Sequence, residues 1–137
     1  MKKICIILLL GICVLASACQ EQPRVAKATY VLVLQGQVKE SGVIQYLDKE
    51  MNVYQDFRSN PCGDCQEQPV SVYVGATAPE VTAALAKAIQ RADDIWVVKE
   101  VQDARLVLEE KNPGEGVKPA EPSAPAGLRI QGTFVVD

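Results

Sequence analysis

Two cysteines stand close together near the middle of the chain, in the sequence NPCGDC. Cys62 and Cys65 form a C-x-x-C pair. Such a pair can be a redox centre, half of a metal site or a short structural disulfide. The choice among these three decides whether the chain carries chemistry at this point.

A redox centre needs a thiol with a lowered pKa, which a helix N-terminus or a nearby cation usually provides. Pro69 and a strand-like segment follow the motif, so no helix begins there. The closest cation in the sequence is Arg58, and Asp64 between the cysteines would raise a thiol pKa. These features argue against a redox centre. A small periplasmic thiol–disulfide protein that uses Cys62 and Cys65 remains the alternative hypothesis.

Other chemistry is poorly supported by the composition. The chain has no histidine, which excludes Ser-His and Cys-His pairs and leaves too few ligands for a structural zinc site. We predict no catalytic residue, no metal site and no cofactor. The residues around the two cysteines are turn formers: Asn60, Pro61, Gly63 and Asp64. In an oxidising compartment they favour a local Cys62–Cys65 disulfide, worth about 2 kcal/mol by loop-closure entropy.

The N-terminus has the parts of a bacterial export signal. Lys2 and Lys3 precede a twelve-residue apolar stretch, residues 4–15, and small residues follow it. Twelve helical residues cover about 18 Å, too short for a bilayer core of about 30 Å. Residues 1–18 are therefore predicted to be a cleaved signal peptide.

The five residues LASAC, ending at Cys19, resemble the lipobox of bacterial lipoproteins, although Leu15 stands one place further upstream than in its commonest form. The resemblance implies cleavage before Cys19, whose sulfur and amine then carry acyl chains such as palmitate. Gln20, in place of Asp, resembles lipoproteins sorted to the outer membrane and facing the periplasm. The alternative is ordinary cleavage after Ala18, which would release a soluble protein.

Removing the signal leaves 119 residues and, with Lys2 and Lys3 lost, moves the net charge from −3 to −5. That length suits one small domain. The mild acidity gives no basic surface for nucleic acid. We expect a polar, lipidated tether over residues 19–28 and one domain over residues 29–137.

The patterning predicts an α+β domain in which one principal helix packs on a small, mainly antiparallel sheet. The helix spans about residues 78–92, where Thr77 and Glu80 form a capping box. Asp93 and Asp94 are interpreted as a solvated turn ending it, and Trp96 as a core residue. Strands are expected over residues 29–35, 69–75, 95–98, 104–109 and 128–137.

Two segments are less regular. Residues 43–57 fit a hairpin that turns at residues 48–50, and a helix over the same residues is the alternative. The Pro-rich residues 112–127 are predicted to be a linker or a long exposed loop.

The stretch from Ala84 to Glu110 resembles a pattern in several bacterial envelope assembly lipoproteins, and this implies one helix packed on a sheet. An anchor, a tether, a compact domain and the lack of a catalytic set lead us to expect a non-enzymatic, lipid-anchored accessory or adaptor that binds another envelope component, such as part of an assembly or secretion apparatus. The alternatives are the thiol–disulfide protein and a binding module for a small ligand or cell-wall fragment.

Overall fold

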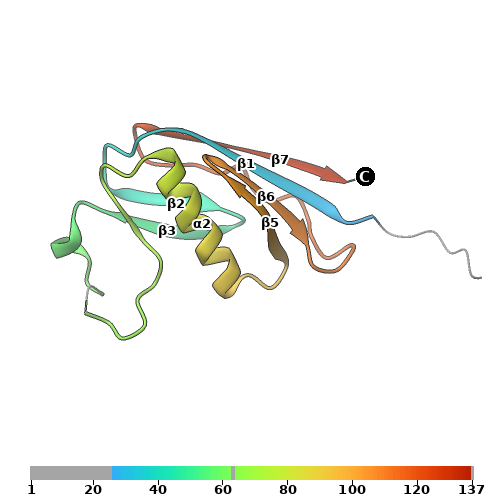
Figure 1. Cartoon of the computed structure of the whole chain (residues 1–137), viewed down its shortest axis with the longest axis horizontal. Coiled ribbons are helices and arrows are strands. Elements are labelled where there is room, and N and C mark those ends of the chain that lie inside the picture. The colour runs from blue at the N-terminus through green and yellow to red at the C-terminus, as the bar shows by residue number, and fades with distance from the viewer. Residues whose placement is uncertain (1–25, 63, 137) are drawn as a thin grey trace, which may run out of the picture.

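The structure, a computed structural model, describes residues 26–62 and 64–136 and has an α+β fold (Figure 1). One four-stranded antiparallel sheet has the order β5 (Trp96–Gln102), β6 (Arg105–Glu110), β1 (Ala28–Gly36) and β7 (Leu128–Val136). The second sheet contains β2 (Gly42–Tyr46), β3 (Lys49–Tyr54) and β4 (Val72–Tyr73). A short 3-10 turn, η1, spans Phe57–Ser59. The α+β prediction is confirmed, with the strands divided between two sheets.

Helix α2 (Ala78–Ala92) begins and ends at the predicted residues. Thr77 accepts the backbone N–H of Glu80, and the Glu80 carboxylate accepts the backbone N–H of Thr77, so the predicted capping box is formed. Val81, Leu85 and Ile89 lie on one helical face and are buried. This apolar face fixes how α2 packs against the sheets.

The hairpin prediction for residues 43–57 is also confirmed, and the helix alternative is wrong. β2 and β3 pair antiparallel, and the turn lies at Leu47 and Asp48, one position earlier than expected. Both turn residues have positive φ angles, 48° and 59°, which match the twist of a two-residue hairpin turn.

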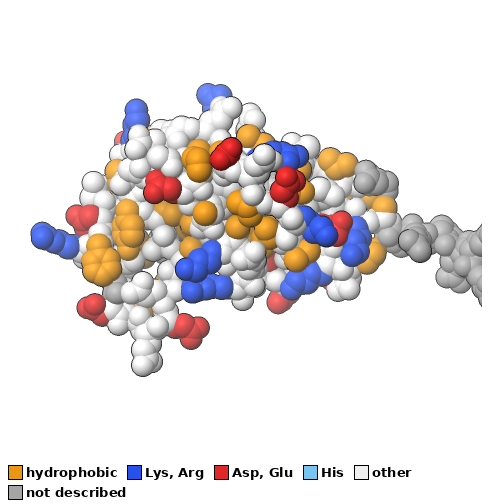
Figure 2. All heavy atoms as spheres, viewed as in Figure 1, with side chains coloured by type: hydrophobic (Ala, Val, Ile, Leu, Met, Phe, Trp, Pro, Cys, Tyr) orange, Lys and Arg blue, Asp and Glu red, His pale blue; other side chains and the backbone are white. Residues whose placement is uncertain are grey.

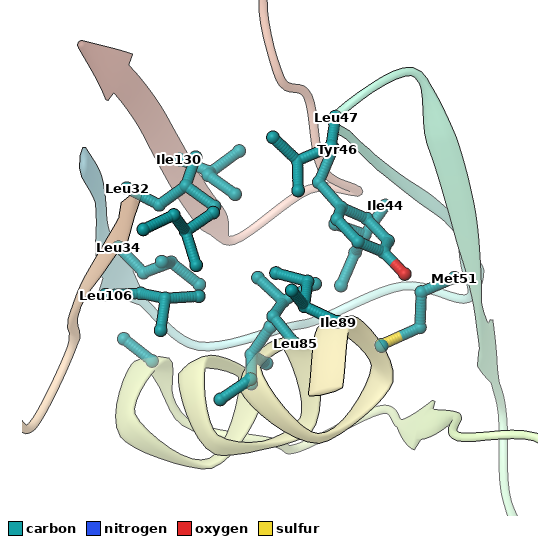
Figure 3. Close-up of a cluster of buried hydrophobic side chains, with 14 of the residues drawn as sticks. Leu32, Leu34, Ile44, Tyr46, Leu47, Met51, Leu85, Ile89, Leu106 and Ile130 are labelled. Atoms are coloured by element: carbon teal, nitrogen blue, oxygen red, sulfur yellow. The ribbon is translucent and has the colours of Figure 1, made fainter. Parts of the chain in front are cut away.

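The core fills the space between α2, the inner face of the four-stranded sheet and the β2–β3 hairpin (Figure 3). Each of the three contributes side chains that point toward the others in this view. The contributors are Leu32, Leu34, Leu106 and Ile130 from the four-stranded sheet, Ile44, Tyr46 and Met51 from the hairpin, and Leu85 and Ile89 from α2. The two sheets are therefore parts of one domain.

The Pro-rich segment has no helix or strand, as expected, but it is not simply an exposed loop. Ser123 exchanges two backbone hydrogen bonds with Gln45, of 2.9 and 3.1 Å, at the open edge of β2. The backbone N–H of Ala120 donates to Asp48, and Pro119 and Pro122 are buried. The segment is thus a strap that covers a sheet edge, and two of its four prolines are buried.

Three other expectations from the sequence are corrected. The domain includes Ala28, which is buried in β1, so the tether ends before that residue. The predicted strand over residues 69–75 is reduced to the two residues of β4. Asp93 is not solvated: it is buried, accepts the backbone N–H groups of Ile95 and Trp96, and pairs with Lys49 at 3.2 Å.

The remaining strand predictions hold. β1 covers the expected segment. β5 begins one residue later than expected and continues to Gln102, and β6 lies one residue later than expected at both ends. β7 joins the sheet along the whole of β1. Trp96 is buried, as predicted, and packs between the rings of Tyr30 and Phe134 at centroid distances of 6.0 and 6.3 Å. On the face seen in Figure 2, hydrophobic, basic and acidic side chains are interspersed.

Candidate functional site

The two cysteines of NPCGDC are brought together. Their sulfurs lie at disulfide-bonding distance, and their Cα atoms are 4.9 Å apart. The backbone N–H of Cys65 donates to the carbonyl of Cys62 at 3.2 Å, which closes a tight turn. Both residues are half-buried. The geometry suits the predicted local disulfide.

Asn60 holds this turn against the second sheet. Its side-chain oxygen accepts the backbone N–H of Cys62 at 2.9 Å. Its side-chain nitrogen donates to the hydroxyls of Ser71 and Tyr73, at 3.3 and 3.0 Å. The sequence marked Asn60 only as a turn former, because its partners lie more than ten residues away along the chain.

An open depression of about 480 Å³ lies beside the turn. Cys65 lines it together with residues 66–71, Tyr73, Lys87 and Arg91. The Arg91 guanidinium donates to the carbonyl of Gln68 at 3.0 Å, which links α2 to the segment after the cysteines. Two cations therefore share a surface with Cys65, although none is near it in the sequence.

These cations were not recognised as site residues. Lys87 and Arg91 are four residues apart, so they share one side of α2, on the exposed surface opposite the core. In the sequence nothing distinguishes them from other exposed residues of an amphipathic helix. The depression could accept a polar group, and the carboxylate of Glu67 lines it together with the two cations.

A second polar cluster surrounds Glu110, whose side chain is buried. The carboxylate accepts the backbone N–H groups of Ala28, Gly114 and Gly116, at 2.8, 3.0 and 2.6 Å. The hydrogen bond from Ala28, followed by those from the two glycines, holds the pKa of Glu110 below its usual value. The cluster joins β6, the start of β1 and the Pro-rich strap, so its role is structural.

This cluster also explains the glycines of residues 114–116. A Gly-rich phosphate loop would need a strand before it and a helix after it, and no helix follows these residues in the described part of the chain. In the structure the N–H groups of Gly114 and Gly116 point at Glu110, a carboxylate of the chain itself.

The predicted lipidation residue, Cys19, lies outside the described residues. Within residues 26–62 and 64–136, no group of three or more His, Cys, Asp or Glu side chains could hold a metal ion. In the same part of the chain, no helix has the length and apolar character needed to cross a membrane. No protein-family model matches the chain, and no curated protein sequence matches it.

Proposed function

We propose that this protein is a lipid-anchored, non-enzymatic lipoprotein of the bacterial outer membrane, facing the periplasm. The sequence LASAC, placed directly after a short apolar stretch, carries the proposal. A multiply acylated Cys19 would give stable attachment, whereas one acyl chain would not. The domain begins at Ala28, so residues 20–27 would let it stand up to about 28 Å from the lipid.

The experiment is to label cells with radioactive palmitate and to fractionate them. The wild type should carry label and sediment with membranes, whereas Cys19→Ser should lose the label and should not be cut before residue 19. Cys62→Ser is the matched control, since it also removes one thiol but should keep both the label and the membrane location. Full membrane retention of a processed, unlabelled Cys19→Ser protein contradicts the anchor.

The anchored domain is proposed to act as an accessory or adaptor that binds another envelope component, such as part of an assembly or secretion apparatus. An anchor, a tether and a small domain support this role, because they place a binding surface near the membrane. Cross-linking in intact cells should return one recurrent protein partner with the wild type and much less of it with Cys19→Ser. Failure to recover any recurrent protein would contradict the adaptor role, but it would not contradict the lipid anchor.

A second candidate function is thiol–disulfide exchange, favoured by the two cations beside Cys65. A substrate thiolate would attack one sulfur of the Cys62–Cys65 disulfide and release the other as a thiolate. The second substrate thiol would then resolve the mixed disulfide, so the substrate is oxidised and the cysteine pair reduced by two electrons. Oxidation of a model dithiol peptide that stops in Cys62→Ser, and slows in Lys87→Gln with Arg91→Gln, would favour this function.

A further inference from the structure

Strand β7 forms an edge of the four-stranded sheet, beside β1 (Figure 1). Every second residue of an edge strand directs its backbone N–H and C=O groups away from the sheet. The N–H of Leu34 donates to Ala104 on the β6 side of β1, so even-numbered residues of β1 point their N–H and C=O groups away from β7. The N–H of Gln37 donates to Gly127, on the β7 side, so the odd-numbered residues point toward β7.

The register between β1 and β7 shows which residues of β7 direct their backbone N–H and C=O groups toward β1 and which direct them outward. Val31 pairs with Thr133, and Val33 pairs with Gln131, so odd residues of β7 exchange hydrogen bonds with β1. The even residues therefore direct their N–H and C=O groups outward: Ile130, Gly132, Phe134 and Val136. No other strand or bridge within the described residues pairs with β7.

β5, the opposite edge strand of the same sheet, has features that prevent pairing with another strand, and β7 lacks them. β5 has a register shift between Val98 and Glu100 and carries the charges of Lys99 and Glu100. Bulges and edge charges are the devices that prevent edge-to-edge pairing. β7 pairs regularly over nine residues, contains no proline, and has Arg129 as its one charged residue. The asymmetry marks β7 as an edge available for strand addition.

We propose that β7 pairs with β7 of a second copy of this chain, antiparallel and centred on Gly132. This register uses all nine residues of each strand and sets the outward-facing even residues opposite one another. It would join two four-stranded sheets into one continuous sheet of eight strands. The proposal is independent of the lipid anchor.

The side chains are compatible with this pairing. On the core side, Ile130 would face Phe134 of the second copy, an aromatic and β-branched pair that stabilises antiparallel strands. Leu128 would face Val136, which is 58% exposed in the single chain. On the outer side Gln131 would face Thr133, and Arg129 would face Val135, so no like charges are opposed.

The first experiment is a disulfide cross-link in the full-length protein. Gln131 and Thr133 of the second copy would form a non-hydrogen-bonded pair with Cα atoms about 4.5 Å apart, within disulfide range. The double variant Gln131→Cys with Thr133→Cys should therefore give an oxidised dimer in intact cells, lost on reduction. The control is Thr29→Cys with Val31→Cys, which has the same spacing on the same face of β1, one strand inside the edge.

The second experiment tests the register. In the cross-linking background, Val135→Lys would place a lysine opposite Arg129 of the second copy, and Val135→Glu would place an opposite charge there. Val135 is 42% exposed, so neither change should disturb the single domain. Each dimer contains two such pairs. We therefore expect the association constant of the dimer to be about 2- to 30-fold lower for the lysine variant than for the glutamate variant.

Three results would overturn the proposal. One is a folded Gln131→Cys, Thr133→Cys protein that gives no more dimer than the β1 control. Another is equal dimer formation in the Val135→Lys and Val135→Glu variants. The third is a cross-link from β7 to a different protein, which would show that another chain supplies the added strand.

Discussion

Replacing Gly132 with alanine is predicted to destabilise the domain through one steric contact. A methyl group at this position would lie 2.5 Å from Cζ of Tyr30 and closer still to its hydroxyl oxygen. Tyr30 is 2% exposed and packs against Trp96, so its ring has little room to move away. Gly132 is therefore required because the side chain of Tyr30 occupies the space that a Cβ atom would need.

The size of the effect follows from two opposing terms. Adding volume to a packed core usually costs about 1–3 kcal/mol. Replacing glycine by alanine recovers about 0.4–1 kcal/mol, because the unfolded chain loses conformational freedom. The middle of the two ranges leaves a net loss of about 1.3 kcal/mol, which lowers the unfolding midpoint of a domain of this size by about 5–10 °C.

Thermal melts followed by circular dichroism measure this loss, at one fixed protein concentration for all variants. Thr133→Ala, the neighbouring position on the opposite face of β7, is the control and should change the free energy of unfolding by less than about 0.5 kcal/mol. Tyr30→Phe removes the closest atom, so Gly132→Ala should cost less in that background. An unchanged or raised midpoint for Gly132→Ala, or an equal cost in both backgrounds, would refute the steric explanation.

Three further predictions concern the disulfide and two buried carboxylates, Glu110 and Asp93. Replacing both Cys62 and Cys65 by serine should lower the free energy of unfolding by about 2 kcal/mol, measured by urea titration, because the loop that they close is short. Glu110→Gln should lower the melting temperature at neutral pH and flatten its fall in acid. The folded-state pKa of Glu110 is lowered, so its contribution is full above about pH 4.3 and is lost as the pH falls toward the folded value; melts at pH 3 and pH 7 test this sign. Asp93→Ala leaves two backbone N–H groups without their acceptor and should cost about 1–3 kcal/mol, whereas Lys49→Met removes only a half-exposed partner and should cost less than about 1 kcal/mol in the same urea titration.

Local features of the fold could be predicted well from the sequence. The bounds of α2 follow from a capping box at Thr77 and an apolar face of 3.6-residue period, and both depend on residues within a few positions of each other. β7 was predicted because alternation continues in the sequence after the Pro-rich segment. The C-x-x-C turn was predicted because its neighbours are turn formers.

Features that depend on distant partners could not be predicted. Asp93 resembles a solvated turn residue in the sequence, and the N–H groups that it accepts are local, but its ion-pair partner Lys49 comes from the distant β2–β3 hairpin. The Pro-rich segment lacks the apolar surface to order itself, yet β2 offers it an unpaired edge at Gln45. In both cases the deciding partner lies many residues away.

The sequence by itself determined the signal-like N-terminus, the helix, the terminal strand and the cysteine turn, because each is specified by neighbours along the chain. The choice between a hairpin and a helix for residues 43–57 was decided only by the structure. Only the tertiary structure placed Lys87 and Arg91 beside Cys65 and enclosed the carboxylate of Glu110 in backbone N–H groups. It alone shows that no strand within residues 26–62 and 64–136 pairs with the outer edge of β7. The physical reason is that these arrangements depend on how the two sheets and α2 pack together, and no short stretch of sequence specifies that packing.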